Sequence, residues 1–146
     1  MRYLIYYRED LDSGFKILSK DKESRLVHGK KVSSPSGLSL YQALRSSNQP
    51  LKCWECGIEA SCFIANKGQN DIVSKPVLDL FAEANGKYVL MTRDHIIPRS
   101  LGGINDVKNL RVGCQPCNSA RGNSMNEEDL KFMEEHPELI KTREKM

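Results

Sequence analysis

The sequence has no long hydrophobic run, little net charge of either sign and only 3 histidines in 146 residues. A transmembrane helix needs about 20 consecutive apolar residues, and no stretch approaches that length, so we expect no membrane partner. The first residues, MRYLIYYRED, turn acidic too soon for a secretory signal peptide. These absences favour a globular chain in the cytoplasm.

The net charge is only +3, but it is unevenly distributed. Lys and Arg outnumber Asp and Glu by 10 to 5 over residues 1–52 and by 5 to 2 over residues 90–125. Two basic segments are compatible with a polyanionic partner, although charge alone does not identify one. The length fits one domain, or one domain with a small appendage.

Four of the five cysteines form two Cys-x-x-Cys pairs, Cys53 with Cys56 and Cys114 with Cys117. In a reducing compartment this spacing favours a metal site over disulfides. Zn²⁺ takes four nitrogen or sulfur ligands in a tetrahedron, and each pair supplies two thiolates from one tight turn. We therefore predict one closed, structural zinc site, with four free core thiols as the alternative. We expect Cys62 to be a small buried apolar residue rather than a ligand.

The first third of the chain reads as two strands and a helix. Residues 2–7 and 15–20 are expected to pair as a hairpin, and residues 33–47 contain a helix with an apolar face. These elements would form a β-β-α appendage over residues 1–52, which is a candidate DNA-contacting segment.

Two further patterns follow the first cysteine pair. Residues 76–83 and 88–95 alternate apolar and polar side chains around Asn85-Gly86, a strong signal for a hairpin. Asn126, followed by acidic residues, predicts the start of a helix. We therefore divide the rest of the chain into a core and a C-terminal helical tail, residues 53–125 and 126–146.

The second hairpin ends in Asp94-His95-Ile-Ile-Pro, between the two cysteine pairs. From Cys53 to about Asn123 the sequence resembles the HNH, or ββα-metal, endonucleases. The run VLMTRDHIIPRSLGGINDVKNLRVGCQPCNSARGN is especially similar to HNH proteins common in bacteriophage genomes. The triad has Asn in its third position, as in HNN variants, and reads His95, Asn109, Asn118.

The resemblance implies an α+β fold with a small ββα-metal, treble-clef-like nuclease core that zinc staples together. It implies a metal-dependent endonuclease that hydrolyses DNA phosphodiester bonds, by nicking as a monomer or by double-strand cleavage as a homodimer. For a phage-encoded chain, the location would be the cytoplasm of the bacterial host.

Phosphodiester hydrolysis needs an activated water, a counter-charge and a stabilised leaving oxyanion, and one divalent cation supplies the last two. Asp94 and Asn118 offer the oxygen ligands that Mg²⁺ prefers, with Mn²⁺ as the other candidate. His95 is the expected general base, because imidazole accepts a proton from water near neutral pH. Adjacent strand residues point to opposite faces, so we expect Asp94 or His95 to leave regular strand geometry. By resemblance, Asn109 braces the loop and orients the His95 ring.

Basic residues near the triad are candidate DNA contacts, with a solvated face as the alternative: Arg93, Arg99, Lys108, Arg111 and Arg121. Two other functions stay open for the whole chain. One is a zinc-knuckle nucleic-acid-binding module without catalysis, and the other is a zinc scaffold for protein partners. The joint occurrence of Asp94, His95 and Asn118 favours the nuclease, because hydrolysis needs these residue types and binding does not.

Overall fold

A computed structural model of the chain describes residues 3–68 and 75–141. Within these residues, four α-helices accompany a five-stranded antiparallel sheet, which confirms the α+β class. The strands are β1 (Tyr3–Asp10), β2 (Leu26–Val27), β3 (Lys30–Lys31), β4 (Ala60–Gly68), β5 (Val77–Ala84), β6 (Lys87–His95) and β7 (Leu110–Cys114). The helices are α1 (Leu11–Leu18), α2 (Leu38–Ser46), α3 (Gln115–Arg121) and α4 (Glu127–Glu135). Short 3₁₀ turns are η1 (Lys22–Ser24), η2 (Arg99–Leu101), η3 (Val107–Asn109) and η4 (Pro137–Leu139).

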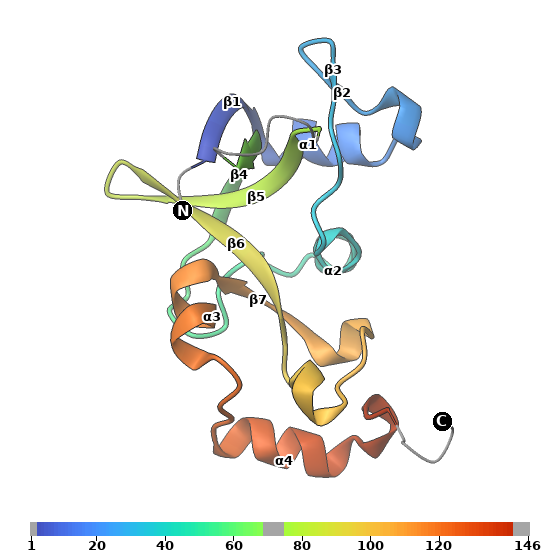
Figure 1. Ribbon diagram of the computed structural model, residues 1–146, viewed down its shortest axis with the longest axis vertical. Helices are drawn as coiled ribbons and strands as arrows, with labels where there is room; N and C mark the ends of the chain where they lie inside the picture. The colour runs from blue at the N-terminus through green and yellow to red at the C-terminus, as the bar shows by residue number, and fades with distance from the viewer. Residues whose placement is uncertain (1–2, 69–74, 142–146) are drawn as a thin grey trace.

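The sheet has the strand order β1-β4-β5-β6-β7, and β2 and β3 form a separate small hairpin. Strand β6 pairs with a different strand along each half of its length. Its first half pairs with β5, as in Phe81 opposite Leu90, and its second half pairs with β7, from Met91 opposite Cys114 to His95 opposite Leu110. Figure 1 shows β6 running from the β5–β6 hairpin, past α3, towards the end of the molecule where α4 lies.

The predicted hairpin around Asn85-Gly86 is confirmed as β5 and β6. Asn85 has a φ of 53° and Gly86 a φ of 75°. Positive φ at both central positions is the type I′ turn, whose backbone twist matches that of the flanking strands. The turn therefore fixes which residues of β6 face which side.

The expected hairpin of residues 2–7 and 15–20 is wrong, although β1 itself is present. The second segment falls largely in helix α1, because the Asp10 side chain accepts a hydrogen bond from Ser13 N at 2.8 Å and caps the helix. Phe15 and Leu18 then lie on one buried helical face. Strand β1 pairs instead with β4, so the β-β-α description of residues 1–52 is corrected to β-α with a small hairpin and α2.

One hydrophobic core joins the first third of the chain to the rest. It contains Phe15, Leu40 and Tyr41 from the N-terminal helices together with Phe63 of β4 and Val112 of β7. The segment before residue 53 therefore shares a sheet and a core with the elements that carry the cysteine pairs.

Asn126 caps α4 as predicted, since its side chain accepts from Asp129 N at 2.7 Å. The expected helical tail ends early: after η4, Ile140 is extended and bridges Gly103. Pro137 breaks the helix because it cannot donate an intrahelical hydrogen bond. The last expected helical residues, 142–146, lie outside the described part. Across residues 3–68 and 75–141, we find no helix with the length and apolar character to cross a membrane.

Candidate active site and metal centre

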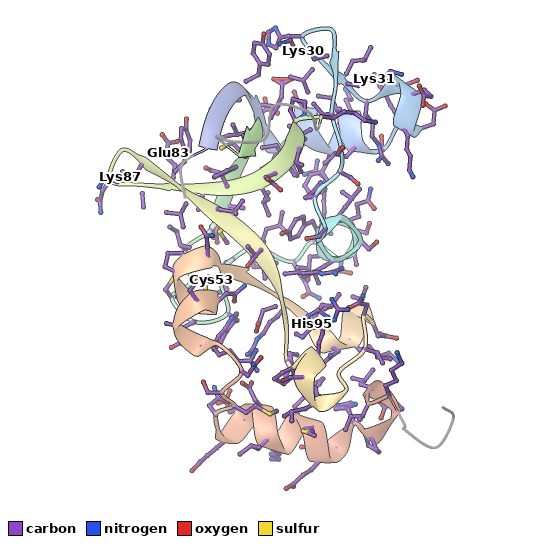
Figure 2. The ribbon with its side chains drawn as sticks, in the orientation of Figure 1. Lys30, Lys31, Cys53, Glu83, Lys87 and His95 are labelled. Atoms are coloured by element: carbon purple, nitrogen blue, oxygen red, sulfur yellow. The ribbon has the colours of Figure 1, made fainter. Side chains whose placement is uncertain are left out.

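The four paired cysteines come together at one end of β7. Their sulfur atoms all lie within 4.8 Å of one another, and Cys56 Sγ lies 3.7 Å from Cys114 Sγ. A tetrahedral Zn²⁺ with Zn–S bonds of 2.3 Å would separate its sulfurs by about 3.8 Å. The cluster therefore fits a metal such as zinc. Figure 2 shows Cys53 beside α3, the helix that carries Cys117.

Backbone hydrogen bonds shape both cysteine turns. Trp54 N donates to Val112 O at 2.9 Å and ties the first turn to β7, and Gly57 adopts a φ of 78° directly after Cys56. Burial raises the pKa of Cys114, and a hydrogen bond with Cys114 raises that of Cys117.

Burial also acts to raise the pKa of Cys53, but backbone N–H groups of Cys114, Cys56 and Glu55 outweigh it and lower the pKa to about 6. Four thiolates this close together need a cation to balance their charge. Cys62 lies elsewhere, fully buried with Ile64 and Phe81, as predicted for an apolar residue.

Asp94 and His95 are the last two residues of β6, and Figure 2 places His95 at the end of that strand. Both stay in register with β7, Asp94 opposite Arg111 and His95 opposite Leu110. The expectation that one of them would leave regular strand geometry is therefore wrong. Their partners accordingly differ. His95 Nε2 lies 2.6 Å from Asn105 Oδ1 in the following loop, whereas Asp94 contacts arginines of β7 and α3.

Asn109 is fully buried, and its side chain hydrogen-bonds to backbone groups of the loop that follows β6. Its Oδ1 accepts from Ile97 N at 2.9 Å, and its Nδ2 donates to Ile97 O at 3.2 Å and to Ile104 O at 3.0 Å. The His95 ring, however, is hydrogen-bonded to Asn105, whose Oδ1 is the acceptor. Asn109 therefore acts on the loop, and Asn105 acts on the ring.

Asn118 lies in α3, directly after Cys117. Its Nδ2 donates to Thr92 Oγ1, and Thr92 in turn donates to Gly113 O at 3.0 Å. The Oδ1 atom is buried and has no hydrogen-bond partner among the described residues. Thr92 and Asp94 are two residues apart on β6 and share a face of the strand. An unpaired amide oxygen thus lies on the same side of β6 as the Asp94 carboxylate, beside Gly113 of β7.

Asp94 is part of a buried ion-pair cluster. Its carboxylate accepts from Arg111 Nε at 2.8 Å and from Arg121 Nη1 at 2.8 and 3.0 Å. Both guanidinium groups also bind Asp129, the third residue of α4. The Arg111 guanidinium stacks on Trp54, 3.8 Å from the ring centre. The cluster links β6, β7, α3 and α4.

The five predicted DNA contacts fall into two groups. Arg111 and Arg121 have side chains only 18 % and 6 % exposed, and their partners are carboxylates rather than solvent. Arg99 and Lys108 are exposed, and Arg93 is half-buried and donates to Ser36 O at 3.0 Å. Arg99, Asn105 and Lys141 help line a surface pocket of about 280 Å³ next to the His95 loop.

Sequence reasoning missed Asn105, Thr92, Trp54 and Asp129. Asn105 lies in a loop, where no periodicity places a side chain. Asp129 reads as one more acidic residue in a helix start, and only the fold shows that it is 2 % exposed. The signal for Trp54 was its place inside the first cysteine pair.

Residues 85–132 match the HNH endonuclease family. The matched segment runs from the β5–β6 turn into α4 and includes the predicted triad, Cys114 and Cys117, but not Cys53 or Cys56. Comparisons with curated proteins and with solved structures give no match. The family match supports a nuclease that acts on nucleic acid. The HNH endonuclease resemblance read from the sequence is thereby confirmed for the segment that contains His95, Asn109 and Asn118.

Proposed function

We propose that the protein is a metal-dependent endonuclease that hydrolyses DNA phosphodiester bonds, with His95 as the general base. The observation that carries this proposal is the position of His95. It ends β6 beside Asp94, within the matched segment, and its ring is held by a hydrogen bond to a loop side chain.

The Asn105 contact supports a defined tautomer of His95. With Asn105 Oδ1 as the acceptor, the 2.6 Å contact puts a proton on Nε2. In the neutral ring the Nδ1 lone pair then accepts a proton from the attacking water. The hydrogen bond also fixes the ring plane, so that the base does not need to be oriented during the reaction.

We assign the catalytic cation, Mg²⁺ or Mn²⁺, to Asp94 and Asn118. The unpaired Asn118 Oδ1 and the Asp94 carboxylate supply one neutral and one charged oxygen on the same side of β6. When bound, such a cation neutralises charge on the phosphate and stabilises the leaving oxyanion. His95 lies on the opposite face of β6 from Asp94. The general base and the metal ligands can therefore reach the same phosphate only at the end of the strand.

The four-cysteine site is proposed to hold structural Zn²⁺. Four thiolates close the shell and leave no position for substrate. Cys117 directly precedes Asn118, so the zinc would fix the start of α3 and, with it, the amide ligand. The protein would then have two metal sites with different roles. The closed thiolate site would maintain the fold, and the open oxygen site would hold the cation used in the reaction.

DNA contacts are proposed for the exposed basic residues near His95. Arg99 and Lys141 line the pocket that also contains Asn105, and Lys108 is exposed on the same loop. Arg93 is a further candidate. Arg111 and Arg121 would act through Asp94, because their charges are already paired inside the protein. Contacts of this kind bind phosphates without reading sequence.

We further propose a phage origin, a location in the host cytoplasm, and action as a monomer or homodimer.

A catalytically idle nucleic-acid-binding module is the second candidate. One observation favours it, namely that guanidinium groups engage both oxygens of Asp94.

A plasmid-nicking assay separates these functions. The full chain should convert supercoiled to nicked or linear plasmid with Mg²⁺ or Mn²⁺ and not with EDTA. His95→Ala should lower the rate by about 10²- to 10⁴-fold, the range for loss of a general base. His136→Ala is the matched control, since His136 lies after α4, outside the matched segment, and its ring packs on Phe132 and contacts Glu138 at 2.9 Å. Plasmid binding in EDTA together with no cleavage under any cation would support the idle module instead.

A further inference from the structure

The buried ion-pair cluster has more members than the proposed catalytic site needs. It contains two carboxylates, Asp94 of β6 and Asp129 of α4, and two guanidinium groups, Arg111 of β7 and Arg121 of α3. The formal charges sum to zero. The Asp129 side chain is only 3 % exposed, although the other acidic residues of the same helical turn, Glu127 and Glu128, are exposed.

The hydrogen bonds of the two arginines are divided between the two carboxylates. Arg111 directs Nη1 and Nη2 to Asp129, at 2.9 and 3.2 Å, and only Nε to Asp94. Arg121 directs Nη1 to Asp94 and to His95 O, and Nη2 to Asp129 and to Ile96 O. Asp129 therefore accepts two hydrogen bonds from the Arg111 guanidinium and one from the Arg121 guanidinium.

This division determines how well Asp94 can bind a cation. A buried charge needs a partner of opposite charge. A buried charge that loses its partner destabilises the folded protein or makes neighbouring groups rearrange to pair with it. If Asp129 carried no charge, Asp94 would be the only carboxylate left to neutralise both guanidinium groups. Both guanidinium groups already contact Asp94, and without the Asp129 charge they would leave the cluster with one net positive charge. A divalent cation at Asp94 would meet that like charge and bind more weakly.

We propose that Asp129 is a positioning residue of the active site: by neutralising Arg111 and part of Arg121, it leaves Asp94 able to hold the divalent cation. This inference rests on the metal site proposed above and extends it to α4. The start of that helix supports the role, because Asn126 caps it and its N-terminal backbone dipoles favour a carboxylate at this position.

The test measures Mn²⁺ binding to the full zinc-loaded chain, by the loss of the free Mn²⁺ electron paramagnetic resonance signal. Asp129→Asn should weaken Mn²⁺ binding by about 10- to 100-fold, the usual effect of removing a residue that supports a metal ligand. Glu128→Gln is the matched control, since it removes the same charge from an exposed neighbour, and its affinity should not change. Asp94→Asn should abolish the binding and so identifies the site.

A charge-restoring double variant separates this role from a purely structural one. Arg111→Gln combined with Asp129→Asn returns the cluster to neutrality and should recover most of the lost Mn²⁺ affinity. If Asp129 only maintained the fold, the double variant would bind no better than Asp129→Asn, because it loses still more contacts. Asp129→Glu, which keeps the charge, should bind Mn²⁺ better than Asp129→Asn.

The outcomes also distinguish this inference from the proposed function. Wild-type affinity in Asp129→Asn, with binding lost in Asp94→Asn, would overturn the inference and leave the proposed metal site intact. Binding that persists in Asp94→Asn would overturn both. Melting curves of each zinc-loaded variant, recorded without Mn²⁺ or chelator, ensure that affinities are compared between folded proteins.

Discussion

The exchange Gly113→Ala puts a single methyl group against the proposed catalytic amide. Gly113 lies in β7, and a Cβ atom there would come within 2.3 Å of Asn118 Oδ1 and within 3.0 Å of Trp54 Nε1. Carbon atoms normally stay about 3.5 Å or more from such neighbours. The Asn118 amide would therefore have to move by about 1 Å, since favourable contacts begin near that separation.

This displacement affects activity more than folding. Overpacking by one methyl group costs roughly 1–3 kcal/mol of stability. A misplacement of about 1 Å in an active site can cost about 10²-fold in rate. Asn118 cannot move freely, because Nδ2 is bound to Thr92 and the preceding residue is Cys117 of the metal cluster. We therefore expect Gly113→Ala to fold at low temperature but to cleave about 10²-fold more slowly.

Initial rates of plasmid nicking, measured well below the melting temperature, check this expectation. Gly14→Ala is the matched control, because its Cβ would lie 2.2 Å from Phe63 Cδ2, in the core rather than beside Asn118. The control should lose stability and retain its rate. A wild-type nicking rate in Gly113→Ala would refute the role given to the Asn118 amide.

Three further predictions concern the metals and the loop. Cys53→Ser should lose most of its stability and the zinc, roughly one ion per chain, that a single four-thiolate shell holds. Cys62→Ser, the control, should retain the zinc. Elemental analysis and melting curves test both variants. Brief EDTA treatment should stop cleavage before it removes the zinc, and Mg²⁺ alone should restore it; recovery only with Zn²⁺ would contradict a hard catalytic cation. Asn109→Ala should lower the free energy of unfolding by roughly 1–3 kcal/mol for each buried backbone group left unpaired, and an unchanged melting curve would contradict the bracing role that its bonds to Ile97 and Ile104 indicate.

The local features that the sequence predicted correctly depend on short-range rules. Asn85-Gly86 needs only its own backbone to make a turn, and Asn126 caps α4 with a side chain three residues from its partner. The cysteine cluster was predictable at long range because metal geometry dictates that four thiols meet wherever the chain brings two pairs.

Other features depended on tertiary packing that patterns do not reveal. Residues 15–18 were read as strand, since Phe15, Ile17 and Leu18 have apolar side chains suited to either structure, and the Asp10 cap decided for helix. The partner of His95 was expected to be Asn109, but the loop turns that amide inwards and brings Asn105 to the ring. The arginines around Asp94 were read as DNA contacts because a sequence does not show which carboxylate will neutralise a basic side chain.

Strand β6 has a consequence for the cooperativity of unfolding. Residues 87–90 pair with β5 in the main core, and residues 91–95 pair with β7 in the segment that carries the cysteines. A single continuous backbone thus belongs to both halves, and neither half can melt without removing hydrogen-bond partners from the other. Calorimetry should accordingly show one transition, and the amide protons of β6 should exchange with solvent together, at the rate set by global opening.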